Sequence, residues 1–238
     1  MFVKIFVFAF IVAHVVAEIP SYIHACSRNN PNYNQCVMNN INNVKDKICK
    51  GFPEFDIPPN EPLFFESVVF DEDNLKLHLK QAKVYGICNF VINSVDTDSE
   101  KLHFNINILY PRLHINTTYD FAVRLLVPIA YQGLIEAVSE NIIMKVGLDL
   151  KVITKNHKKH IFASKVNINL GIKSFEYKFG QSKKELTQEL YQVLNDSLKN
   201  NQQDIIRAVK PELEKEASRI IISIFNGITR SNYKELFP

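Results

Sequence analysis

Apolar and polar residues alternate over several long stretches between residues 102 and 179. The apolar positions are Leu102, Phe104, Ile106 and Ile108, then Leu113, Ile115, Tyr119, Phe121, Val123, Leu125, Val127 and Ile129, then Met144, Val146, Leu148, Leu150 and Val152, and finally Val166, Ile168, Leu170 and Ile172. Because successive side chains of a strand point to opposite faces, each stretch predicts a strand with one apolar and one polar face. We therefore expect long antiparallel strands in a sheet that curls, with an apolar element covering its inner face.

A helix and two more strands are predicted before this region. Residues 33–49 repeat apolar side chains at three- and four-residue spacing, and Gly51 follows as a stop signal. Four prolines come shortly after Gly51 and exclude regular structure there. Strands are expected at 63–70 and 75–92, and a slip in the alternation at residues 79–82 indicates a bulge in the second of them.

Two helices are predicted after the strands. Ser182 and Glu185 have the spacing of a capping box and precede an apolar stripe. Pro211 suits the first turn of a second helix, for which Gly227 is a C-terminal stop signal. The segment 131–142 fits neither the helical nor the strand period clearly. The fold class is therefore α+β, with one of the C-terminal helices as the natural cover for the curled sheet.

The N-terminus has the pattern of a secretory signal peptide. A basic start, a short apolar run and small residues at the cleavage position predict residues 1–17 as the signal and 18–238 as a single domain. The apolar run is shorter than the roughly 20 residues that a membrane span needs. We therefore expect a soluble, extracellular protein without stable membrane insertion. N-glycosylation sequons at Asn116 and Asn195 agree with secretion, and Asn116 falls on the polar face of its predicted strand.

Charged and reactive side chains indicate little chemistry. The formal net charge of +3 is too small to indicate nucleic acid as a partner. One basic cluster, residues 155–160, lies between two predicted strands and is interpreted as a solvated hairpin tip. The chain has no nucleophile elbow or glycine-rich phosphate loop, and no histidine with zinc-ligand spacing to another histidine or cysteine. We predict no enzyme, metal site or cofactor; a hydrolase with a scattered site is the weakest alternative.

Four cysteines suit an oxidising compartment. Cys26 and Cys36 enclose a polar, turn-forming stretch, and we expect them to pair. Cys49 and Cys88 are then left either to pair with each other or to stay free and buried.

Several motifs resemble the insect takeout and juvenile-hormone-binding family (JHBP family) over nearly the whole chain. The most specific is the proline-rich stretch GFPEFDIPPNEPL at residues 51–63. Further similar segments are the cysteine loop 26–36, 84–92, 111–119, 128–133 and the ending 233–238. The resemblance implies a strongly curved antiparallel sheet wrapped around a long C-terminal helix, a TULIP-like lipid-binding super-roll. It also implies a secreted, non-enzymatic carrier of a small hydrophobic ligand.

A carrier of this kind would hold a juvenile-hormone-like terpenoid, a fatty acid or a similar lipid in an apolar tunnel between helix and sheet. The residues expected to line the tunnel are Phe104, Ile106, Ile108, Phe121, Val123, Leu125, Met144 and Val146, from the phase of the strands, and Phe225, from the last predicted helix. Tyr110 and Tyr119 would hydrogen-bond a polar ligand head. The alternative is a packed, ligand-free secreted protein that acts through a receptor or another protein partner. An interior cavity of at least about 300 Å³ would count against that alternative.

Overall fold

The computed structural model describes residues 20–72, 75–98, 100–124, 128–155, 157–180 and 187–230. These residues form one antiparallel sheet in the order β1-β2-β4-β5-β6, with β3 paired to β4 and β7 paired to β5. The strands are β1 Leu63–Glu72, β2 Leu75–Tyr85, β3 Val91–Asp98, β4 His103–Arg124, β5 Pro128–Lys155, β6 Lys158–Gly171 and β7 Glu176–Phe179. The helices are α1 Tyr33–Lys50, α2 Gln188–Asn200 and α3 Gln202–Thr229.

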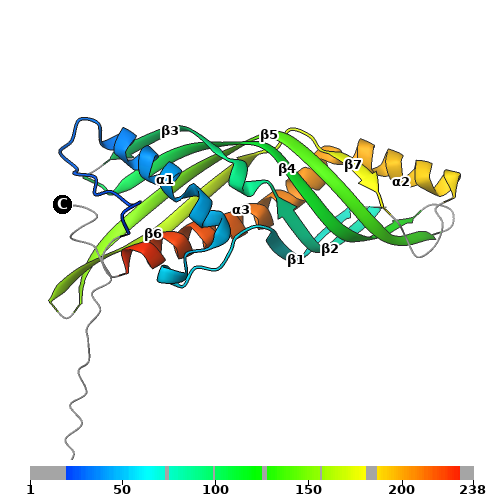
Figure 1. The fold of residues 1–238 in the computed structure, drawn as a ribbon. Coiled ribbons are helices and arrows are strands. Elements are labelled where there is room, and N and C mark those ends of the chain that lie inside the picture. The colour runs from blue at the N-terminus through cyan, green and yellow to red at the C-terminus, as the bar shows by residue number, and fades with distance from the viewer. Residues whose placement is uncertain are drawn as a thin grey trace, which may run out of the picture.

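The sheet is long and curved, and α3 runs along it (Figure 1). Helix α3 contacts both β6 and β1, which are the two ends of the strand order. It therefore bridges the two edges of the curved sheet. Helix α1 lies over one end of the molecule, beside β3, and α2 lies at the opposite end (Figure 1). The predicted fold class, a curved antiparallel sheet around a long C-terminal helix, is therefore confirmed.

The strand predictions hold for β4 and β5, which reach 22 and 28 residues. The undecided segment 131–142 lies inside β5. The expected bulge is present as a register shift between Lys80 and Lys83. The predicted strand 75–92 was too long: it stops at Tyr85, because Gly86 takes a left-handed φ of 90° and lies too close to the backbone of β4 for any side chain.

The buried face changes phase halfway along β4 and β5. In β4, Phe104 and Ile108 are buried near its start, whereas Tyr119 and Phe121 are buried near its end. β5 changes in the same way opposite this point, where Asn141 has a left-handed φ of 53°. The two strands keep one pairing register throughout. The sheet thus has an α1 half and an α2 half, each with its own buried residues under a different helix.

The start of α3 differs from the prediction. The helix begins at Gln202, so Pro211 lies in its interior rather than in its first turn. Ile205 and Ile206 are buried. Burying two such side chains contributes roughly 3–6 kcal/mol, which offsets the cost of about 3 kcal/mol for an interior proline. Gly227 does not end the helix either; it leaves room for Ile57, whose side chain lies 2.8 Å from where a Cβ would stand.

Helix α1 follows the prediction closely, from Tyr33 to Lys50 with Gly51 after it. Helix α2 begins at Gln188, and its N-cap Thr187 accepts a hydrogen bond from the Leu190 backbone N–H. The predicted capping box at Ser182 and Glu185 lies outside the described residues.

Replacing Pro211 with alanine is expected to raise the free energy of unfolding by up to about 3 kcal/mol, since alanine restores a helical N–H and removes the steric clash. Pro211 is exposed, so the change leaves the buried contacts of α3 intact. Urea denaturation followed by circular dichroism measures it. No gain in stability would show that Pro211 costs little at this position of the folded helix.

Candidate ligand-binding cavity

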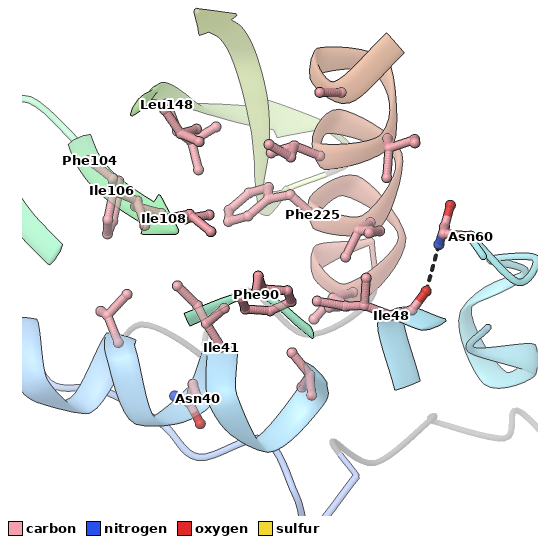
Figure 2. A pocket seen from close by; sticks show the side chains of 18 of the residues that line it. Asn40, Ile41, Ile48, Asn60, Phe90, Phe104, Ile106, Ile108, Leu148 and Phe225 are labelled. Atoms are coloured by element: carbon pink, nitrogen blue, oxygen red, sulfur yellow. Dashed lines mark hydrogen bonds between the residues drawn. The ribbon is translucent and has the colours of Figure 1, made fainter. Parts of the chain in front are cut away.

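A cavity of about 320 Å³ lies in the α1 half, between the sheet, α1 and α3. The sheet contributes its inward-facing positions, among them Ile106, Ile108 and Leu148. In Figure 2, Phe225 reaches across from α3 toward these strand residues, while Ile41 faces them from α1. The walls come from segments far apart in the sequence, so the cavity exists only in the folded chain.

Seven of the predicted ligand-binding residues line this cavity. They are Phe104, Ile106, Ile108, Tyr110, Met144, Val146 and Phe225. Tyr119 and Phe121 instead lie in the packed core of the α2 half, together with Leu194 and Leu198 of α2. The side chain of Val123 and the whole of Leu125 lie outside the described part of the chain.

Sequence reasoning missed the contribution of α1. Val37, Ile41, Val44 and Ile48 line the cavity from this helix. Their three- and four-residue spacing indicated an apolar helix face, but such a face more often packs against a filled core. Ala217 on α3 was missed as well, because alanine gives no signal by which a cavity wall could be recognised.

Most polar groups at the cavity are already hydrogen-bonded within its wall. Asn40 accepts from the His24 backbone N–H at 2.8 Å and donates to the His24 carbonyl at 2.6 Å. Asn60 donates to the carbonyl of Ile48 at 2.8 Å (Figure 2), and the Thr229 hydroxyl donates to the carbonyl of Phe225 at 2.9 Å. These bonds hold the wall together and leave these groups little capacity for a ligand.

Tyr110 is the exception among the polar lining groups. Its hydroxyl makes one weak contact, with the Met144 sulfur at 4.0 Å. Burial raises the pKa of Tyr110 to about 12, so the hydroxyl is a neutral donor at physiological pH. Among the described residues, no lysine, arginine or carboxylate lines the cavity, and His24 is exposed at its rim.

Two disulfides fasten α1 over the cavity. Cys26–Cys36 ties the preceding segment to the first turn of α1, and Cys49–Cys88 ties the last turn of α1 to the short 3₁₀ helix before β3. Cys49 and Cys88 were expected either to pair or to remain free and buried, and in the structure they form a disulfide. Glu61 lies next to this disulfide, but sulfurs bonded to each other are not available as thiolate ligands, so the group is not a metal site.

Glu61 and Lys45 complete the attachment of this wall. The Glu61 carboxylate accepts hydrogen bonds from the backbone N–H groups of Gly86 and Cys88, at 2.8 and 3.1 Å. Lys45 of α1 donates to the carbonyl of Phe90, and its ammonium group lies 4.9 Å from the centre of the Phe90 ring. Since Phe90 lines the cavity, the hydrogen bond and the cation–π contact from Lys45 fix this wall of the cavity to α1.

The curved sheet, the enclosed helix and the apolar cavity define an α+β protein with an interior site for an apolar molecule. The sequence matches the family model described as haemolymph juvenile hormone binding protein (JHBP) over residues 5–238, and the chain therefore belongs to this family. None of the curated proteins matches the sequence significantly.

Among solved structures, the chain is similar to Takeout 1 of Epiphyas postvittana, with a TM-score of 0.71 and 18% identity over 86% of this chain and 95% of that one. This likeness supports the fold. A weaker likeness, to lipopolysaccharide binding protein, has a TM-score of 0.37 and 12% identity over 74% of this chain and 37% of that one. None of the helices in the described residues combines the length and the apolar character that crossing a membrane requires.

Proposed function

We propose that the protein is a secreted carrier that binds a small, neutral hydrophobic ligand, such as a terpenoid or a lipid, in the cavity of the α1 half. The observation that carries this proposal is the apolar cavity of about 320 Å³, in which the Tyr110 hydroxyl makes only a weak hydrogen bond within the protein. Membership of the JHBP family supports it. A ligand that buries roughly 300 Å² of apolar surface gains about 7 kcal/mol, which corresponds to about micromolar affinity before ordering costs.

The lining of the cavity favours a ligand without charge. A buried carboxylate needs a cation or several hydrogen-bond donors, and in the described lining inside the rim at His24 the Tyr110 hydroxyl is the one donor with only a weak partner. An ester, ketone, alcohol or epoxide needs one hydrogen bond, which Tyr110 can supply. Seven residues are thereby proposed as ligand contacts: Phe104, Ile106, Ile108, Tyr110, Met144, Val146 and Phe225.

The packed, ligand-free interaction protein is the competing proposal. The volume of about 320 Å³ exceeds the threshold of about 300 Å³ at which a cavity weighs against that function. In the α2 half, by contrast, Leu194 and Leu198 of α2 are packed against the sheet. A hollow of about 490 Å³ beside Phe121 is also present there, but its lining includes the charged side chains of Lys76 and Asp120, which do not suit an apolar ligand. We therefore place the ligand in the α1 half and assign the α2 half to stability.

Secretion is the remaining part of the proposal. The N-terminal pattern supports it, and so do two disulfides, which persist in oxidising compartments. Asn116 is exposed on β4, as a glycan acceptor must be. Asn195 is half-buried and its side-chain oxygen accepts a hydrogen bond from the Tyr177 hydroxyl at 3.0 Å, so we propose Asn116 as the principal glycosylation site.

The first test is mass spectrometry of small molecules extracted from the natively purified secreted protein. The proposal expects one neutral lipid or terpenoid at close to one molecule per chain. A clean extract, together with failure of candidate ligands to displace a fluorescent fatty-acid probe, would support the packed interaction protein instead.

A fatty-acid methyl ester is expected to bind at least about 100-fold more tightly than the corresponding carboxylate at pH 7.5, because the buried carboxylate lacks a partner. The difference should shrink as the pH falls through the pKa of the free acid, since the protonated acid is neutral. Probe displacement at pH 7.5 and pH 4.5 measures both effects. Equal affinity at pH 7.5 would show that the carboxylate reaches the rim near His24 or solvent.

A further inference from the structure

The hairpin that joins β5 and β6 carries a concentration of basic residues. Residues 151–160 contain four lysines and two histidines, and neither aspartate nor glutamate. Lys155 of β5 pairs with Lys158 of β6, and His157, just before Lys158, has a left-handed φ of 60°. Figure 1 shows this hairpin extending past the end of α3. The basic cluster is therefore held on a projecting element.

Exposed aliphatic side chains accompany these charges. Ile153 is 47% exposed and Val152 is 36% exposed, which places both among the most exposed large apolar residues described. Ile153 stands opposite His160, and Lys151 stands opposite Phe162, so these four side chains share one face of the hairpin. The hairpin thus alternates cationic and apolar groups at its surface, the combination found on elements that lie at a lipid–water interface.

Two lysines of the hairpin have no ionic partner among the described residues. Lys151 and Lys159 are exposed, and neither takes part in any ion pair among the described residues. Lysines elsewhere on the sheet do pair with carboxylates, as Lys76 does with Asp71. The nearest carboxylate on the face of Lys151 is that of Asp149, which is already hydrogen-bonded to His103 at 2.6 Å. The end of the hairpin beyond Asp149 is therefore cationic and complementary to an external anionic surface.

We propose that the β5–β6 hairpin docks the protein on an anionic phospholipid surface. Lys151 and Lys159 lie on opposite faces of the hairpin, so its end contacts lipid phosphates from both sides. Ile153 enters the headgroup region, which distinguishes this surface from a purely electrostatic polyanion site. The same two strands continue into the α1 half, where Leu148 of β5 lines the cavity. Docking would therefore bring the cavity end of the molecule to the membrane, without insertion of a spanning segment.

The test is co-sedimentation of the full secreted chain with vesicles of phosphatidylcholine containing 30% phosphatidylserine, compared with pure phosphatidylcholine. The double variant Lys151→Gln/Lys159→Gln should lower the partition coefficient about 25-fold, because each lysine near an anionic surface contributes about a factor of five. Ile153→Ser should lower it about tenfold, with little dependence on salt. Both changes are at exposed positions, and circular dichroism checks that the variants fold.

Lys173→Gln/Lys199→Gln is the matched control, since both lysines are exposed and lie away from the hairpin. It removes the same charge and should leave vesicle binding unchanged. Equal loss in this control, or equal binding to pure phosphatidylcholine, would overturn the proposal. So would tighter binding to DNA than to vesicles that is lost in the hairpin variant. These readouts do not require a ligand, so a failure of the carrier proposal leaves them interpretable.

Discussion

Replacing Ala217 with tryptophan is expected to lower ligand affinity at least about 100-fold while the protein stays folded. Ala217 lies on α3 at the cavity wall, so the indole ring would occupy the space that the ligand needs. Because the added ring fills apolar volume, the free energy of unfolding should stay unchanged or rise by about 0.5–2 kcal/mol. Displacement of a fluorescent fatty-acid probe measures the loss of binding, and thermal unfolding measures stability.

The chain contains no tryptophan, so this substitution also introduces a single fluorescent reporter. A blue-shifted emission maximum would show that the indole lies in the apolar cavity. Ala130→Trp is the matched control: Ala130 is exposed on β5 in the α2 half, and its variant should bind ligand normally and emit at longer wavelength. Normal binding by Ala217→Trp with blue-shifted emission would place the ligand outside this cavity.

Removing the second disulfide, with Cys49→Ala and Cys88→Ala together, is expected to lower the free energy of unfolding by about 4 kcal/mol. The bond closes a loop between cysteines 39 residues apart, and its loss enlarges the conformational entropy of the unfolded chain. It also frees the last turn of α1 from the 3₁₀ helix beside the cavity. Ligand release should therefore accelerate, which stopped-flow probe dissociation measures alongside urea denaturation.

The first disulfide provides the comparison. Cys26 and Cys36 are 10 residues apart, so their joint replacement should cost less, about 3 kcal/mol. Release should be affected in both variants, since each bond fastens one end of α1. If both variants released ligand at the wild-type rate despite lower stability, α1 would be a fixed wall rather than an element that opens for exchange.

The sequence determined the strands and the side of each strand that faces inward. Alternation is a local property of neighbouring residues, so Phe104, Ile106 and Met144 could be placed on the inner face before any tertiary contact was known. The bulge in β2 and the limits of α1 followed from local signals in the same way. Gly86 was missed because its left-handed φ, set by the nearby β4 backbone, has no periodic signal.

Tertiary structure alone decided where the apolar interior is hollow. Tyr119 and Phe121 belong to an alternating apolar run of β4, as Ile106 does, yet they pack in the core with Leu194 and Leu198 of α2 rather than lining the cavity of the α1 half. The start of α3 was decided in the same way, because burial of Ile205 and Ile206 outweighs the local cost of Pro211. The alternation of a strand predicts which side chains point inward. Whether those side chains pack closely or leave a cavity depends on the volume of the helix that covers them, which is a long-range property of the fold.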